Sequence, residues 1–154
     1  MLRLQTKRPV DVNEAINIVT AEVPEYVGDL MKREPRSKAW IRPDELISDV
    51  LAKLEFEDVG ALIVSAKGNR IAGIISERDV VRGMRYYGAE VFDLQVAVLM
   101  QDDVITCQAK DTVQHATRLM QLHHIRHLPV VEGSKFVGLM SLRDALPQAR
   151  SCHN

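Results

Sequence analysis

Apolar residues along this chain follow two patterns in turn, and the same order of patterns occurs twice. Spacings of three and four residues, as in Val113, Ala116 and Met120, predict amphipathic helices. Short unbroken apolar runs beside clusters of turn-forming residues predict buried strands. In the first half we expect a helix over 44–56, strands over 61–64 and 71–75, and a helix over 77–87. In the second half we expect a helix behind Asp111 as its N-cap, strands over 128–131 and 136–140, and a closing helix over 142–149 that Pro147 interrupts.

One short phrase marks the two halves as copies of one unit. Residues 73–79 read Gly-Ile-Ile-Ser-Glu-Arg-Asp and residues 138–144 read Gly-Leu-Met-Ser-Leu-Arg-Asp, so that four residue types recur 65 positions apart. Upstream of the turn between the strands, the offset is 66. A repeat of this length predicts two copies of one supersecondary unit, and a unit of about 55 residues buries too little surface to be stable alone. We therefore predict an α/β fold in which two helix–strand–strand–helix repeats pack about a pseudo-twofold axis. The first repeat covers 27–92, and the second, with a short tail, covers 93–154.

Residues 1–26 stand outside the repeat. They contain one apolar helical face that ends at Pro24 and is formed by Val12, Ala15, Ile16, Val19 and Val23. We expect an extra helix that packs on the repeat pair or on a second subunit.

Composition argues against several classes of protein. The 154 residues are 46% hydrophobic and 27% charged, which is ordinary for a globular protein. The net charge of −1 offers no basic surplus for a nucleic-acid backbone, and no apolar run approaches the length of a membrane span. The first residues lack a signal-peptide core, and Cys107 and Cys152 lack metal or redox spacing. We therefore expect a reduced, cytoplasmic protein without a membrane or nucleic-acid partner.

The chain resembles a tandem pair of CBS domains, the cystathionine-β-synthase type of regulatory unit, over residues 27–147. The resemblance rests on the run His127-Leu128-Pro129-Val130-Val131, on the Gly-x-x-Ser-x-x-Asp phrase in both copies, and on the order of helices and strands. It implies a pair that binds adenosine-containing ligands in clefts between the copies and dimerises into a flat disc. The helices carry apolar residues for such a homodimer, namely Leu51, Leu54, Leu119 and Leu122.

The chemistry of the repeated phrase fits that implication. A glycine lets a ligand approach the backbone, and a serine at a helix start forms an anion site with the N–H groups there. Arginine is a forked donor for phosphate, and aspartate accepts hydrogen bonds from the two hydroxyls of a ribose. The same Ser-x-x-Asp spacing also forms a capping box that needs no ligand. Both interpretations are open for Ser76 with Asp79 and for Ser141 with Asp144.

The resemblance implies two clefts, each built from the phrase of one copy and the lead-in strand of the other. The first consists of Ser76, Arg78, Asp79, Val104 and Thr106, with His127 and Pro129 beside them. The second consists of Ser141, Arg143, Asp144, Ala39 and Trp40. Trp40 departs from the family pattern because Thr106 holds the equivalent position of the other copy. A tryptophan there stacks on a base, fills the pocket or packs in the core.

No catalytic or metal-binding set stands out elsewhere. His123, His124 and His127 are close in sequence, but they span a helix end and a strand start without a cysteine or a carboxylate pair. We expect surface or cleft positions for them and no metal, although one can contact a phosphate. No nucleophile, base and orienting acid can be assembled, so we expect a binding module and not an enzyme.

These observations predict a regulatory sensor whose effector is an adenosine-containing ligand. AMP is favoured, and ATP, NAD and S-adenosylmethionine carry the same adenosine. The chain itself does not identify the protein target that responds. The alternative is a ligand-free pair that serves as a dimerisation or scaffold unit. Thermal stabilisation by a ligand separates the two interpretations, because a ligand that binds only the folded state raises its stability.

Overall fold

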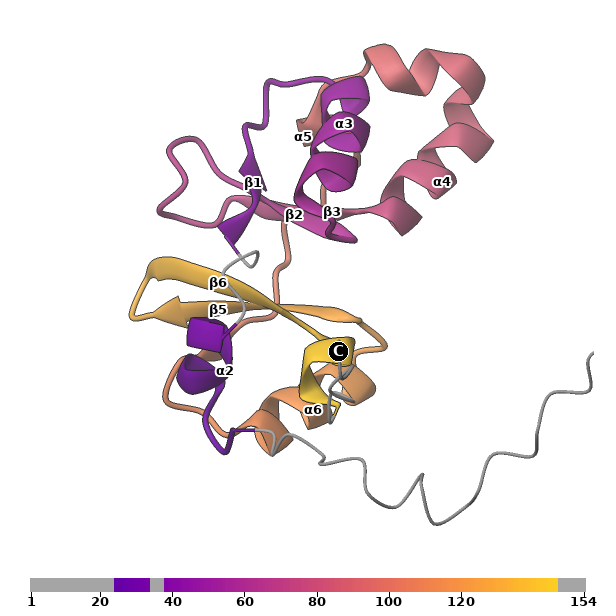
Figure 1. Ribbon diagram of the computed structural model, residues 1–154. Helices are drawn as coiled ribbons and strands as arrows, with labels where there is room; N and C mark the ends of the chain where they lie inside the picture. The colour runs from indigo at the N-terminus through magenta and orange to yellow at the C-terminus, as the bar shows by residue number, and fades with distance from the viewer. Residues whose placement is uncertain (1–23, 34–37, 147–154) are drawn as a thin grey trace, which may run out of the picture.

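The computed structural model describes residues 24–33 and 38–146, and there the two repeats form two stacked halves (Figure 1). The first half contains β1 (Trp40–Ile41), α3 (Ile47–Glu57), β2 (Ala61–Val64), β3 (Gly73–Ser76), α4 (Glu77–Tyr87) and the 3-10 helix η2 (Gly88–Asp93). The second half contains β4 (Cys107–Gln108), α6 (Val113–Leu122), β5 (His127–Glu132), β6 (Lys135–Ser141) and the 3-10 helix η3 (Leu142–Ala145). A short helix precedes each set, α2 (Val27–Arg33) and α5 (Val96–Leu99).

Both halves contain the same three-stranded sheet. β1 is parallel to β2, which is antiparallel to β3, and β4, β5 and β6 repeat this arrangement. The register repeats as well, since Ile41 pairs with Val64 in one sheet and Cys107 pairs with Val130 in the other. Both members of the second pair lie 66 positions after those of the first. The predicted α/β fold of two packed repeats is confirmed.

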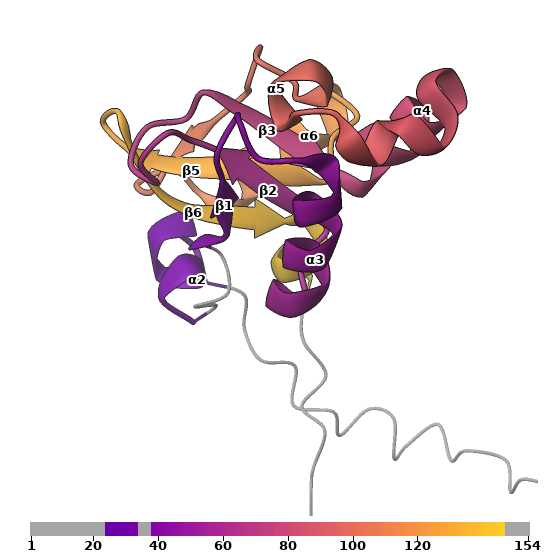
Figure 2. The ribbon, with the colours of Figure 1, turned by 90° about the horizontal axis from the view of Figure 1, so that it is seen from above.

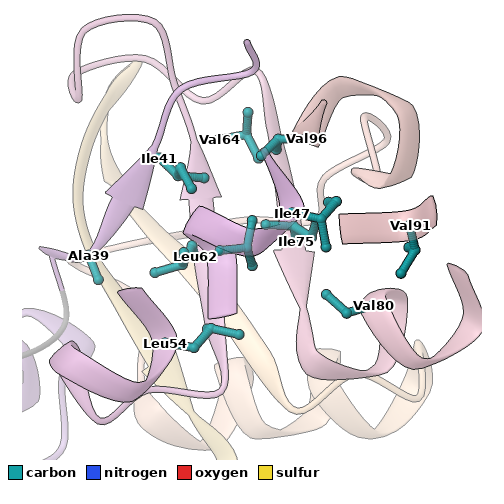
Figure 3. Packing of buried hydrophobic residues seen from close by; sticks show 11 residues of the cluster. Ala39, Ile41, Ile47, Leu54, Leu62, Val64, Ile75, Val80, Val91 and Val96 are labelled. Atoms are coloured by element: carbon teal, nitrogen blue, oxygen red, sulfur yellow. The ribbon is translucent and has the colours of Figure 1, made fainter. Parts of the chain in front are cut away.

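The two sheets pack against each other, as the view from above shows (Figure 2). Ala61 and Ile63 of β2 meet Phe136 and Leu139 of β6 in a shared apolar layer. Successive side chains of a strand point to opposite faces. Leu62 and its neighbours on the other face of the first sheet therefore pack under α3 and α4 (Figure 3). β2 reads as an unbroken apolar run because both of its faces are buried.

The short helices α2 and α5 cross over between the halves. α2 opens the first repeat in sequence, but its Val27 lies in the core of the second half. α5 opens the second repeat, but its Val96 lies in the core of the first half. Backbone hydrogen bonds hold both helices, because Gly28 donates to Ala109 (2.8 Å) and Val96 donates to Glu45 (2.8 Å). Each half completes its core with a segment from the other copy, which ties the two halves into one unit.

The helix starts differ from the sequence prediction for local reasons. α3 begins at Ile47, not near residue 44, because the Asp49 carboxylate accepts a hydrogen bond from the Leu46 N–H (2.9 Å) at the helix start. The N-cap of α6 is Thr112 and not Asp111. The Thr112 hydroxyl accepts a hydrogen bond from the His115 N–H (3.1 Å) in the first turn of the helix. The Asp111 carboxylate instead accepts from the Gln108 N–H (2.8 Å) at the end of β4.

The ends of the chain leave two predictions open. The helix predicted within 1–26, whose apolar face ends at Val23, lies outside the described residues. After β6 the described chain forms only the single 3-10 turn of η3, and the remainder of the predicted helix over 142–149 also lies outside the described residues.

The apolar residues expected at a dimer interface divide into two groups. Leu54 is only 5% exposed and belongs to the first core, and Leu119 packs against the second core. Leu54 is a correction, because its side chain is buried in the core, whereas Leu119 is only partly buried and its place at an interface stays a prediction. Leu51 and Leu122 are exposed at 39% and 72% and remain available.

Candidate functional site

The first repeated phrase forms a polar anchor where β3 ends and α4 begins. The Asp79 carboxylate accepts hydrogen bonds from the Ser76 N–H (2.8 Å) and from the Ser76 hydroxyl (2.7 Å) on one oxygen. Its other oxygen accepts from the side-chain amide of Gln101 (3.2 Å), which lies on the connection between the repeats. Asp79 is 8% exposed, so these donors hold a buried carboxylate in one orientation. A carboxylate has about four lone-pair sites, so acceptor capacity remains for a ligand.

The second phrase forms the same anchor at η3. The Asp144 carboxylate accepts from the Ser141 N–H (2.7 Å), and the Ser141 hydroxyl accepts from the Asp144 N–H (3.3 Å). Both phrases are therefore capping boxes, as one of the two sequence interpretations expected. Capping fixes the serine and aspartate but does not exclude a ligand, because each pair also borders a cleft.

The first anchor opens into a cleft of about 480 Å³ between the two halves, here named cleft 1. Six of the seven residues predicted for this site line it, namely Ser76, Arg78, Asp79, Val104, His127 and Pro129. Thr106 is exposed and does not line the cleft; its neighbour Ile105 does. Cleft 1 is therefore lined by both polar and apolar side chains.

Three arginines that line cleft 1 make no ion pair or side-chain hydrogen bond within the described ranges 24–33 and 38–146. These are Arg78, Arg82 and Arg126. Arg78 and Arg82 are four residues apart on α4, so they share one helix face. Guanidinium groups that converge on a cleft without protein partners suit a phosphate.

The two repeats differ in one backbone hydrogen bond between strands, at a position that borders cleft 1. In the first sheet, the Ile63 N–H donates to the Ala39 carbonyl (3.2 Å). The equivalent residues 66 positions later are Pro129 and Ile105, and proline has no N–H to donate. Proline is tolerated within β5 because β4 pairs only with Val130 and Val131. The Ile105 carbonyl thus lacks that strand partner, at a point where both residues line cleft 1.

A second cleft of about 650 Å³, here named cleft 2, lies beside the second anchor. Four of the predicted residues line it, namely Ala39, Ser141, Arg143 and Asp144. Trp40 does not line cleft 2. Its ring lies against the turn at Gly68 and under the Lys53 ammonium, 5.4 Å from the ring centroid, so it packs beside the sheet-to-sheet core.

His127 lies between the clefts and lines both. Burial lowers the pKa of its imidazole, and Arg126 adds to this. Glu77 and Asp144 act in the opposite direction and favour the protonated ring. A Cβ on Gly60 would lie 3.0 Å from two atoms of this ring, so the bare glycine makes room for it. His127 is therefore a titratable side chain in the wall between the two clefts, with a lowered pKa.

Sequence reasoning missed several residues that line cleft 1, namely Arg82, Gln101, Asp103 and Arg126. Arg82 could have been predicted as a cleft residue, because it follows Arg78 by four residues and therefore lies on the same face of the predicted helix. The others lie on the connection between repeats and before β5, and only the packing of the halves brings them to the cleft.

The described residues offer no alternative chemistry. No group of three or more His, Cys, Asp or Glu residues within them is placed to hold a metal ion. Cys107 is buried in the second core, and burial raises the pKa of its thiol to about 12, so it does not form a reactive thiolate. Within 24–33 and 38–146, no helix is long and apolar enough to cross a bilayer.

The family model described as CBS domain matches residues 27–86 and 93–148, so the chain belongs to the CBS domain family. It is 30% identical over 128 residues to the mitochondrial CBS domain-containing protein CBSX3 of Arabidopsis thaliana, and the match covers 78% of this chain and 62% of that protein. The chain spans about three fifths of the length of such curated relatives.

Solved structures extend this similarity to three dimensions. The CBS-domain containing protein ATU1752 from Agrobacterium tumefaciens matches with a TM-score of 0.73 and 30% identity, over 79% of this chain and 96% of that one. The CBS domain protein PAE2072 from Pyrobaculum aerophilum, solved in complex with AMP, matches with a TM-score of 0.69 and 28% identity, over 77% of this chain and 88% of that one. The chain is thus a tandem CBS pair of the regulatory type.

Proposed function

We propose that this protein is a cytoplasmic sensor that binds AMP in cleft 1 and changes its contacts with a protein target in response. The observation that carries the proposal is that the Ser76–Asp79 anchor, apolar side chains and three arginines without a partner among the described residues line one cleft. The AMP complex of PAE2072, a structural relative at 28% identity, supports the choice of ligand.

Each part of cleft 1 has a role in this proposal. Asp79 accepts hydrogen bonds from the ribose hydroxyls, since its orientation is already fixed. Ser76 and Arg78 bind the phosphate, and Arg82 and Arg126 add positive charge around it. Val104, Ile105 and Pro129 enclose the adenine, and the Ile105 carbonyl accepts from its amino group.

The ligand acts by binding one arrangement of the two halves more tightly than another, because an effector shifts an equilibrium only through differential affinity. Gln101 contacts Asp79 and lies on the connection between the repeats, so occupancy of cleft 1 bears directly on how the halves are joined. We expect binding without turnover, since the part of the chain that the structure describes presents no activated nucleophile to the cleft.

Isothermal titration calorimetry with AMP tests the proposal. We expect Asp79→Ala to weaken AMP binding by about ten- to hundredfold, because a ligand hydroxyl that loses its partner costs about 1–3 kcal/mol. Asp49→Ala is the matched control, since Asp49 accepts the Leu46 N–H at the start of α3 as Asp79 accepts the Ser76 N–H at the start of α4. Equal AMP affinity in the parent and the Asp79 variant would contradict the assignment.

A dimerisation or scaffold unit without a ligand is the second candidate. The observation in its favour is the exposed apolar side of α4, where Val81, Met84 and Tyr87 are 65%, 46% and 44% exposed. A thermal shift assay separates the candidates, because AMP raises the unfolding temperature only if it binds the folded protein. A homodimer is compatible with both candidates.

A further inference from the structure

Asp58 and His124 occupy equivalent positions in the two repeats, although their side chains differ in charge. His124 lies 66 positions after Asp58, the offset that relates the two sheets. Each follows the helix of its repeat, and both have left-handed backbone conformations, with φ of 52° and 54°. His124 lines cleft 1, and Asp58 lines cleft 2. The same point of the fold thus presents an imidazole to one cleft and a carboxylate to the other.

Counted with Asp58 and His124 included, the charged residues that line the clefts differ by one net charge, and Asp58 accounts for that difference. Cleft 1 has three arginines (Arg78, Arg82, Arg126), three acidic residues (Glu77, Asp79, Asp103) and three histidines (His123, His124, His127). Cleft 2 has two arginines (Arg126, Arg143), three acidic residues (Asp58, Glu77, Asp144) and one histidine (His127). With neutral histidines, the described lining residues sum to 3 − 3 = 0 in cleft 1 and 2 − 3 = −1 in cleft 2.

We infer that the two clefts divide adenosine ligands by charge, so that cleft 1 takes a phosphorylated adenosine and cleft 2 takes an adenosine compound without phosphate. This inference rests on the proposed function, because it assigns ligand classes to the clefts of the same sensor. Both anchors offer the same Ser–Asp pair, so the adenosine part has equivalent partners in each cleft. A phosphate in cleft 2 shares the cleft with the carboxylate of Asp58, whereas the equivalent lining residue of cleft 1 is His124. Asp58 is exposed, so its repulsion of a phosphate acts through solvent, and like charges placed together in one cleft disfavour binding.

Calorimetry with AMP and adenosine on the full chain tests the inference. In the parent we expect one AMP per chain, bound in cleft 1. In the Asp79→Ala variant, which weakens cleft 1, we expect adenosine to bind at least about tenfold more tightly than AMP. Adding Ser141→Ala and Asp144→Ala should abolish that adenosine binding, which locates it in cleft 2.

The charge of Asp58 is tested by Asp58→Asn in the Asp79→Ala background. Asparagine tolerates the left-handed conformation of this position, so the backbone is retained. We expect AMP affinity to rise about tenfold and adenosine affinity to stay unchanged. Glu55→Gln is the matched control, because Glu55 is an exposed acid on α3 that does not line cleft 2.

The outcomes separate the inference from the proposed function. If the parent binds two AMP molecules with similar affinity, or if Asp58→Asn leaves AMP affinity unchanged, the division by charge is wrong and the AMP sensor stands. If Asp79→Ala binds no adenosine, cleft 2 is not an adenosine site. If the parent binds neither AMP nor adenosine, the proposed function and the inference both fail.

Discussion

Gly73 opens the first repeated phrase, and its lack of a side chain serves the packing of the chain itself. A Cβ at this buried position would lie 2.8 Å from the backbone carbonyl oxygen of Gln101 and 2.9 Å from the Met100 sulfur. Gln101 is held there by two backbone hydrogen bonds with Ile74, each 2.9 Å long. Gly73→Ala therefore pushes the connection between the repeats away from β3.

The expected cost follows from these contacts. A methyl group forced against backbone typically costs 1–3 kcal/mol, and each backbone hydrogen bond that is lost or stretched costs about 1 kcal/mol. We expect the free energy of unfolding to fall by about 2–4 kcal/mol, which for a protein of this length lowers the unfolding temperature by roughly 4–16 °C. AMP binding should weaken as well, because Gln101 and Val104 line cleft 1 on the displaced segment.

Urea unfolding followed by circular dichroism measures the first effect, and calorimetry with AMP measures the second. Arg85→Ala is the control, because Arg85 is exposed on α4 and alanine at that position introduces no clash. A loss below about 0.5 kcal/mol for Gly73→Ala, within the range of ordinary surface substitutions, would refute the close fit of the connection against β3.

Two further predictions concern pH and assembly. Because the pKa of His127 is lowered in the folded protein, the unfolded chain binds more protons, and stability should be lost as the pH falls below about 6.5. In urea titrations at pH 7.5 and 5.5, His127→Gln should lose less stability than the parent; equal losses would contradict this assignment. We also expect a homodimer through α4, which Val81→Lys converts to monomers in light scattering and Lys135→Glu, on the β5–β6 hairpin, does not. A monomeric parent at micromolar concentration would rule that dimer out.

Much of the fold could be predicted because its signals are local and occur twice. The apolar run of β2 and the helical pattern of α4 have the predicted bounds, and the repeated phrase located both strand-to-helix junctions. Helix starts were less certain, since the cap depends on which nearby acid or hydroxyl reaches the backbone. For α3 that residue is Asp49, and for α6 it is Thr112.

The candidate site was only partly visible in the sequence. The phrase identified Ser76, Arg78 and Asp79, because a repeated set of polar residues at a helix start has a chemical reason to recur. Arg126 and Gln101 carry no such signal, since they reach cleft 1 through the packing of one half on the other. Trp40 faces the turn at Gly68, which depends on how the first sheet meets that turn.

The sequence by itself therefore determined the duplication, the α/β class and the polar anchors, because periodicity and a repeated phrase are properties of neighbouring residues. Only the tertiary structure decided that α2 and α5 exchange between the halves, and that Asp58 and His124 face different clefts. Those features arise where residues distant in the chain come together. The physical reason is that burial, and the electrostatic environment of a side chain, depend on neighbours in space rather than in sequence.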